Sequence, residues 1–284
     1  MLVSQFAKEA ATRKLRDVVD SEMRRHTEGE AEDDQPPVEI PPCDVLVVFA
    51  LGVESGGLVD RLEESTTLGG QSFREHSGQL GGQRVVVIES GVGRKAAARA
   101  TDDAIALHKP AWVVSAGFAA GLREGLKRGQ IVMADHLRDE PGGDWSVGFK
   151  IAPEAAAATP GLHVGRLLTV DRLVRTRKEK RRLGEEFDAI ALDMETTAVA
   201  EVCQRRQVRL LSVRVISDTV DDELPREIER LMRQQTLAGQ LGAAAGAIIG
   251  RPSSVKDMWK LRDDAFKASE RLATFLLGVL PQLT

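Results

Sequence analysis

The sequence predicts an α/β fold built on a mostly parallel sheet. Several runs of strand length are apolar at almost every position and rich in Val and Ile, which is typical of strands covered on both faces. Segments with helical patterning alternate with these runs, and such alternation indicates parallel strand pairing. The chain has 284 residues, of which 42% are hydrophobic and 29% charged, so it is long enough to bury a sizeable core.

The first 43 residues are predicted to stand apart from this fold. Residues 1–26 are expected to form a charged helix, because apolar residues recur every four positions from Leu15 to Met23. Residues 27–42 are acidic, Pro-rich and without periodicity, which indicates a linker. We therefore predict two parts, a helical extension with a linker over 1–43 and one domain over 44–284.

The elements of the domain follow in chain order. Strands are predicted over 45–51, 84–90, 111–117, 130–135, 165–170, 189–194 and 210–217. Helices are predicted over 94–109, 195–206 and 225–249, with a last one that begins near Ser254. This last helix carries apolar residues from Met258 to Val279 on one face.

Composition and charge exclude several classes of function. The formal net charge is −4 and aromatic residues make up 4%, so the sequence shows no global attraction to nucleic acid or to an anionic membrane. No apolar run is long enough for a spanning helix, and charges interrupt the first residues, where a signal peptide would be apolar. Two cysteines and scattered histidines predict neither a disulfide framework nor a metal site. We expect a cytoplasmic protein.

Carboxylates and small residues follow several of the predicted strands. Glu54 lies beyond the first strand, and the segments GFAAGL, DMETTA and SDTVDDE follow later ones. Ligands of parallel α/β sheets bind at the carboxyl ends of the strands, so these segments are candidates for a site. The same residue types also cap helices, and the pattern alone leaves both interpretations open.

Several sequence blocks resemble the purine nucleoside phosphorylase and uridine phosphorylase superfamily, most closely its methylthioadenosine/S-adenosylhomocysteine nucleosidases. The blocks occur in order over residues 44–220 and read ESGVGRKAAARA, KPAWVVSAGFAAGL, KRGQIVMAD, ALDMETTAVAEV and VRVISDTVDD. The resemblance implies a single α/β domain with a mixed, barrel-like central sheet flanked by helices.

The resemblance also implies an activity. It is that of a hydrolase that cleaves the N-glycosidic bond of a purine nucleoside such as methylthioadenosine, S-adenosylhomocysteine or another 5′-substituted adenosine. This chemistry needs an acid that protonates the purine, a carboxylate that activates water, and groups that hold the ribose hydroxyls. The implied partner is a small-molecule nucleoside, with no cofactor and no metal, and the implied assembly is a dimer or larger homo-oligomer.

The family motifs give roles to individual residues. Asp218 matches the catalytic acid, which needs a raised pKa to work near neutral pH, and Ser217 matches the residue that orients it. Glu195 matches the ribose-binding carboxylate, and Met194 is expected to pack against the sugar. Glu54 matches the water-activating carboxylate. For all three carboxylates the alternative is a structural one, a cap or first-turn residue of a helix.

Five further positions align with the substrate pocket of the family. Arg214 matches an arginine near the nucleophile, with a strand salt bridge as its alternative. Val174 and its neighbour Leu173 match a base-stacking pair in which one member is usually aromatic. Phe118 replaces a serine that contacts the attacking water in the nucleosidases, and Ala119 is expected beside the substrate.

Departures from the family pattern bear on the nucleophile. Phosphorylases carry an arginine and a serine around the glycine that is Gly117 here, whereas this chain has Ser115 and Phe118. This favours water over phosphate, because a phosphate dianion is usually bound by arginine side chains. A phosphorylase stays an alternative, since Arg94, Arg172 and Arg175 could form an unusual anion site.

A shortened segment leaves the 5′ group of the substrate open. Residues 136–150 are shorter than the dimer-interface stretch of the nucleosidases, so a larger 5′ substituent is plausible, as in the related hopanoid-biosynthesis branch. A noncatalytic nucleoside-binding or scaffold protein is a further alternative, favoured by Phe118 and the added helix.

Overall fold

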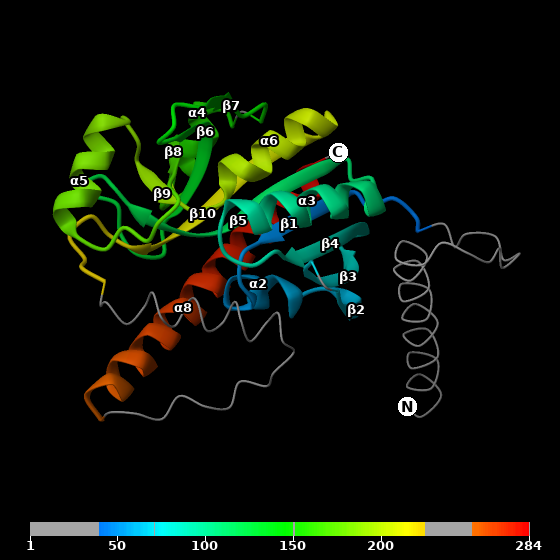
Figure 1. Cartoon of the computed structure of the whole chain (residues 1–284). Coiled ribbons are helices and arrows are strands. Elements are labelled where there is room, and N and C mark those ends of the chain that lie inside the picture. Colours follow the sequence, from blue (N-terminus) through cyan, green and yellow to red (C-terminus); the bar gives the residue numbers. More distant parts are fainter. Residues whose placement is uncertain (1–39, 71, 150, 225–251, 284) are drawn as a thin grey trace, which may run out of the picture. The chain divides into compact units, whose positions relative to one another are not determined.

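The computed structural model describes residues 40–70, 72–149, 151–224 and 252–283 (Figure 1). The helices predicted over 1–26 and 225–249, and nearly all of the linker over 27–42, lie outside the described residues. The proposed division at residues 43 and 44 therefore stays a prediction. The fold described below is that of the domain.

Five strands close into a ring at the centre of the domain. They are β5 (Trp112–Gly121), β6 (Ile131–Asp139), β8 (Leu162–Thr169), β9 (Ala191–Asp193) and β10 (Arg209–Asp218). The order is β10-β6-β8-β9-β5, and pairing of β10 with β5 closes it. Because β10–β6 and β5–β9 are antiparallel, the sheet is mixed rather than mostly parallel. The barrel-like α/β fold implied by the resemblance is confirmed.

A twisted extension continues the sheet beyond β5. Its strands are β1 (Val45–Phe49), β4 (Gln83–Glu89), β3 (Arg74–Leu80) and β2 (Glu63–Gly69), in this order, and β7 (Asp144–Ser146) pairs with β6. β1 runs parallel to both β4 and β5, as the apolar runs predict. The hairpin of β2 and β3 was not predicted, because its residues are mostly polar and give no apolar run.

Helices cover both faces of the extension. They include α2 (Gly52–Val59), α3 (Arg94–His108), α6 (Thr196–Arg206) and α8 (Pro252–Val279). Alternate residues of β1 and β4 bury against α3 and α6 on one face, where Val48 and Ile88 pack with Ala97. The residues on the opposite face of these strands pack against α8, where Val47 and Leu272 belong to one hydrophobic cluster. Burial on both faces explains why these strands are apolar at every position.

The remaining elements are short or charged. They are α4 (Pro153–Ala158), α5 (Arg177–Glu186) and the 3-10 turn η1 (Leu280–Gln282). The sequence RKEKRRLGEE of α5 has no apolar stripe, and this helix was not predicted from the sequence. Among the described residues, no helix has the length and apolar character needed to cross a membrane, and no cluster of His, Cys, Asp or Glu is placed to hold a metal ion.

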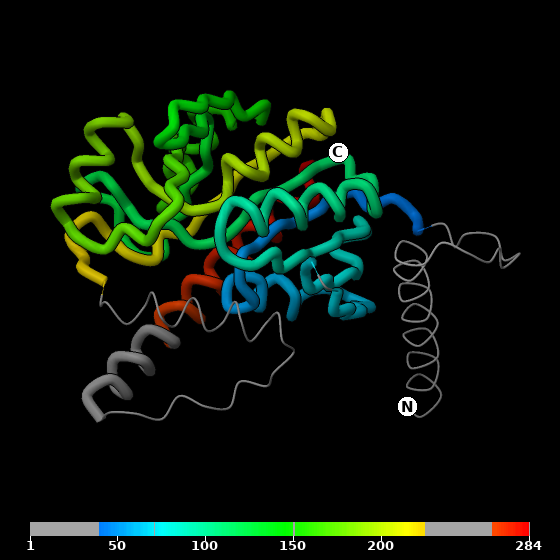
Figure 2. The backbone as a smooth tube through the Cα atoms, in the orientation of Figure 1, coloured from blue at the N-terminus to red at the C-terminus, as the bar shows by residue number. Residues whose placement is uncertain are grey.

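The end of the chain packs directly behind α2. Figure 2 shows α2 and the later part of α8 next to each other, although they lie far apart in the sequence. The Ser269 hydroxyl accepts a hydrogen bond from Gly57 N–H at 3.0 Å and donates one to the backbone oxygen of Glu54 at 3.1 Å. A Cβ at Gly57 would lie 2.9 Å from the Ser269 backbone oxygen, so only glycine permits this approach.

Candidate active site

A cavity of about 470 Å³ lies at the carboxyl ends of β1 and β10 and against the last part of β5. Eight of the residues predicted for the site line it together. They are Glu54, Phe118, Ala119, Val174, Met194, Glu195, Ser217 and Asp218. The ninth, Arg214, lines an adjoining hollow with Glu54 and Glu195. The three predicted carboxylates therefore come together from segments that are distant in the sequence.

Glu54 lies in the first turn of α2, not in a loop, and its carboxylate is almost saturated by backbone donors. Oε2 accepts from Ala50 N at 3.1 Å and from Leu51 N at 2.9 Å, and Oε1 accepts from Phe118 N at 2.9 Å. A carboxylate has about four lone-pair positions, so about one remains, on Oε1. Burial raises the pKa of Glu54, while the three backbone hydrogen bonds act in the opposite direction.

The backbone of β5 approaches Glu54 closely at Gly117. A Cβ on Gly117 would lie 2.9 Å from Glu54 Oε1, closer than side chains tolerate. The next residue, Phe118, holds Glu54 through its backbone N–H, and its partly buried side chain forms part of the cavity wall. The contact to Glu54 therefore does not depend on which side chain stands at position 118.

Glu195 is the N-cap residue of α6 and faces the loop before α3. Its Oε1 accepts a hydrogen bond from Gly93 N at 2.8 Å, and Gly93 has a φ of 96°, which favours glycine. Burial, helped by the negative charges of Asp193 and Glu54, raises the pKa of Glu195 to about 8. The cavity therefore contains a carboxyl group that readily holds a proton near neutral pH.

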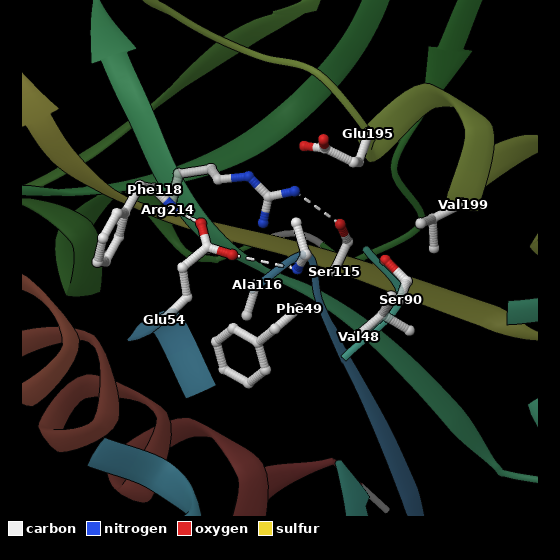
Figure 3. Close-up of a pocket in the computed structure, with 12 residues that line it drawn as sticks. Val48, Phe49, Glu54, Ser90, Ser115, Ala116, Phe118, Glu195, Val199 and Arg214 are labelled. Atoms are coloured by element: carbon white, nitrogen blue, oxygen red, sulfur yellow. Dashed lines mark hydrogen bonds between the residues drawn. The ribbon is translucent and has the colours of Figure 1, made fainter. Parts of the chain in front are cut away.

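Arg214 is buried and its charge is balanced locally. Its Nη2 donates to Asp193 Oδ2 and to Ser115 Oγ, both at 2.8 Å, and also contacts the hydroxyl of Thr196. In Figure 3 its guanidinium lies between the carboxylates of Glu54 and Glu195. The salt bridge that was the structural alternative for Arg214 is thus present, and the arginine also borders the site.

The hollow next to Arg214 is very small. Its volume is about 10 Å³, and Glu54, Ser90, Ser115 and Glu195 are among the residues that line it. This volume corresponds to about one water molecule, since a water needs roughly 10–15 Å³ measured in this way.

Asp218 ends β10, and both of its carboxylate oxygens have partners. Oδ1 accepts a hydrogen bond from Ser217 Oγ at 2.7 Å, and Oδ2 forms an ion pair with the Nζ of Lys180. Lys180 has 0% of its surface exposed, although it comes from the charged helix α5. Asp218 is thus held by Ser217 and also by a lysine that the sequence analysis missed.

Apolar side chains line the cavity where the resemblance places the base. Val174 is buried against Leu168 and Leu183, so it belongs to the core as well as to the cavity wall. Leu173 and Met194 also line the cavity. The pair at the family's base-stacking position, Leu173 and Val174, is aliphatic in this chain.

Two contributors besides Lys180 were also missed. Asp193 is 4% exposed and binds Arg214, Thr169 and Thr196, so it fixes the arginine next to the hollow. Gly93 positions Glu195 through its backbone. Asp193 could have been found as a carboxylate that directly follows an apolar run, whereas the backbone contact of Gly93 has no side-chain signal.

Replacement of Glu195 by Gln is expected to increase stability at alkaline pH relative to the parent. A raised pKa means that the folded form binds the proton more tightly than the unfolded chain does. That stabilisation is complete below the unfolded value and is lost as the pH rises through the folded value of about 8. Glu195→Gln cannot ionise, so between pH 5 and pH 9 it should avoid a loss of up to about 4 kcal/mol.

The measurement is urea unfolding of both proteins at several pH values. Glu185→Gln, at an exposed position of α5, is the matched control and should follow the parent. Parallel pH dependences for Glu195→Gln and the parent would show that the Glu195 carboxyl is not held in its protonated form.

Comparison with known proteins places this geometry in a family. Residues 44–248 match the model of the phosphorylase superfamily. Among solved structures, the chain is similar to the 5′-methylthioadenosine/S-adenosylhomocysteine nucleosidase of Neisseria meningitidis in complex with methylthio-immucillin-A. The TM-score is 0.61 at 20% identity, over 83% of this chain and 99% of the other.

This chain resembles two further solved structures to a similar degree. The nucleosidase of Helicobacter pylori with butyl-thio-DADMe-Immucillin-A has a TM-score of 0.63 at 20% identity, over 85% of this chain and 99% of the other. The futalosine hydrolase of Helicobacter pylori has a TM-score of 0.64 at 18% identity, over 84% and 98%. These likenesses show the shared fold. Because the family model matches residues 44–248, which is most of this chain, the chain belongs to the phosphorylase superfamily.

Proposed function

We propose that this chain is a nucleoside hydrolase that cleaves the N-glycosidic bond of an adenosine-type nucleoside. The observation that carries the proposal is the convergence of Glu54, Glu195 and Asp218 on one cavity. Its apolar walls suit a purine and its carboxylates suit a sugar, and membership of the superfamily supports the same chemistry. The substrates considered are methylthioadenosine, S-adenosylhomocysteine and other 5′-substituted adenosines.

In the proposed mechanism each carboxylate has its own task. Asp218 protonates N7 of the purine, so that the base leaves without negative charge. Glu54 accepts a proton from the attacking water through the remaining lone pair on Oε1, and Glu195 accepts hydrogen bonds from the ribose diol. General acid or base assistance of this kind is worth about 10²–10⁴-fold in rate for each group. The negative charge of Glu54, before it accepts this proton, also stabilises the positive charge that develops on the sugar.

Three features of the site support water as the nucleophile. The hollow beside Glu54 has the volume of one water molecule. Arg214 is already paired with Asp193, so it offers no uncompensated charge to a phosphate dianion. Arg172, which lines the cavity, pairs with Glu140 and Glu179. A phosphorylase would have to break these ion pairs to bind its second substrate.

The cavity extends beyond the carboxylates towards α8. Val53 and the small residues Ala265 and Ala268 line this part, and Asp264 and Lys267 stand at its charged end. Pockets for drug-sized ligands hold about 300–1,000 Å³, so the cavity has room for a 5′ substituent as well as for the nucleoside. We propose that this substituent is largely apolar.

The test is a panel of nucleosides assayed with and without phosphate, with the free base measured by chromatography. Release of adenine in phosphate-free buffer, with free ribose sugar as the second product, is expected. Strict dependence on phosphate and a sugar 1-phosphate product would instead identify a phosphorylase. Tight binding without turnover across the panel would favour a noncatalytic nucleoside-binding protein.

We propose in addition a homo-oligomer of two or more chains and a cytoplasmic location, as the resemblance implies. Light scattering of the purified full-length chain measures the assembly. A monomer at all concentrations tested would reject the first of these proposals.

A further inference from the structure

We propose that Lys180 is a positioning residue that determines which oxygen of Asp218 delivers the proton and over which pH range it does so. This inference rests on the proposed function, in which Asp218 protonates the leaving base. It concerns a residue in the charged run RKEKRR of α5, which the sequence analysis did not single out.

All three protons of the Lys180 ammonium have acceptors within the protein. One acceptor is Asp218 Oδ2, and the others are the backbone oxygens of Thr219 at 2.8 Å and Asp222 at 3.0 Å. An ammonium has three donors, so none remains for a ligand. Lys180 is also absent from the residues that line the cavity, whereas Asp218 and Ser217 are among them. Any effect of Lys180 on the reaction therefore passes through Asp218.

The two oxygens of Asp218 are not equivalent. Oδ2 is held by the ammonium, which leaves Oδ1 as the oxygen able to carry the transferable proton. Ser217 Oγ lies 2.7 Å from Oδ1 and 3.3 Å from the backbone oxygen of Ala119. A hydroxyl donates one proton at a time, so Ser217 has two alternative acceptors. It donates to Oδ1 when Asp218 is ionised, and to Ala119 when Oδ1 carries its own proton.

The proton balance of the proposed step is closed. The O–H bond at Oδ1 breaks and the N7–H bond of the purine forms, as the electron pair of the glycosidic bond moves to the base. The carboxylate that remains is neutralised by the Lys180 ammonium. Water gives its hydroxyl to C1′ and its proton to Glu54, and exchange with solvent returns both carboxyl groups to their starting states.

Lys180 is the cation in direct contact with Asp218, and the other charges nearby compensate one another. Arg128 lies close enough to act on Asp218 electrostatically, but it pairs with Asp222 and Asp264, each at 3.0 Å. The Asp222 carboxylate also accepts from Thr219 N–H at 2.7 Å. Removal of the Lys180 charge should therefore be felt by Asp218 more than by any other acidic group.

The first test is the pH profile of kcat/KM for Lys180→Met. Methionine is unbranched and similar in length, and it removes the charge. Without the ammonium the carboxylate loses the cation that contacts it, so the alkaline limb of the profile should move to higher pH. Loss of the hold on Oδ2 should also lower the plateau of kcat. Lys178→Met, at an exposed position of the same helix, should leave the profile unchanged.

The second test does not require turnover. Thermal unfolding of Lys180→Met, Asp218→Asn and the double variant forms a cycle in which each single change leaves a buried group without its partner. The double variant should lose less in Tm than the sum of the two single losses. If Lys180→Met does not fold, the double variant should still fold, because the neutral amide of Asp218→Asn needs no ammonium partner.

The outcomes separate this inference from the proposed function. A compensating cycle and a shifted pH profile support it. A profile that superimposes on that of the parent overturns it and leaves Lys180 with a structural role only, and strictly additive losses in Tm overturn the pairing itself. If the parent chain hydrolyses no nucleoside, the proposed function fails and the proton-delivery role fails with it, whereas the cycle still reports on the ion pair.

Discussion

Replacement of Asp218 by Asn is expected to lower kcat for adenine release by about 10²–10⁴-fold, the usual value of a general acid. The amide keeps the shape of the side chain but has no acidic proton to give to the purine. KM should change less than kcat, because the proton is transferred only in the transition state. The measurement is steady-state release of adenine from the best nucleoside of the panel, at several pH values between 6 and 8.

The matched control is Asp221→Asn, three residues further along the chain. Asp221 is exposed and pairs with Arg181 on the surface, so its neutralisation should leave the rate within about twofold. Thermal unfolding of both variants separates a loss of chemistry from a loss of folded protein. Equal rates for Asp218→Asn and the parent would remove Asp218 from the mechanism.

Replacement of Glu54 by Gln is expected to have an effect of similar size, about 10²–10⁴-fold in kcat. The amide cannot accept a proton from water. It also brings an NH₂ group against the backbone donors of Ala50, Leu51 or Phe118, which all point at the carboxylate. One of these contacts becomes donor against donor, so we expect a loss of stability of about 1–3 kcal/mol as well.

Glu63→Gln is the matched control for this variant. Glu63 lies at the exposed start of β2 and outside the cavity wall, so both activity and stability should match the parent. Nucleoside binding, measured by calorimetry, should persist in Glu54→Gln because the base and the diol have other partners. A variant that binds and also turns over at the parent rate would show that water is activated elsewhere.

The strands of the extension could be predicted because both of their faces are buried. Val47 and Val48 point to opposite faces and are both enclosed, so the run around them is apolar without interruption. The hairpin over 63–80 gives no such signal, since residues such as Glu75 and His76 are buried in polar pairs that only the folded chain brings together. The closure of the ring is likewise set by strand pairing that no local pattern records.

The candidate site was predictable to the extent that its side chains stand in motifs. Glu195 and Asp218 occur in sequence blocks with recognisable neighbours, and the structure brings both to the cavity. The partners that hold them are different. Gly93 acts through its backbone, and Lys180 differs from the exposed lysine at position 178 only in where α5 packs. Such supporting contacts depend on tertiary structure and have no local signature.

The hydroxyl of Ser269 connects the last helix to the backbone beneath Glu54. The ribosome makes this helix after the elements that carry Glu54, Glu195 and Asp218. A nascent chain therefore contains Glu54, Glu195 and Asp218 before Ser269 is present to hold α2, the helix that carries Glu54. We expect catalytic competence to begin only after α8 has been synthesised, and a premature stop codon upstream of Ser269 to yield a chain with all three carboxylates and no working centre.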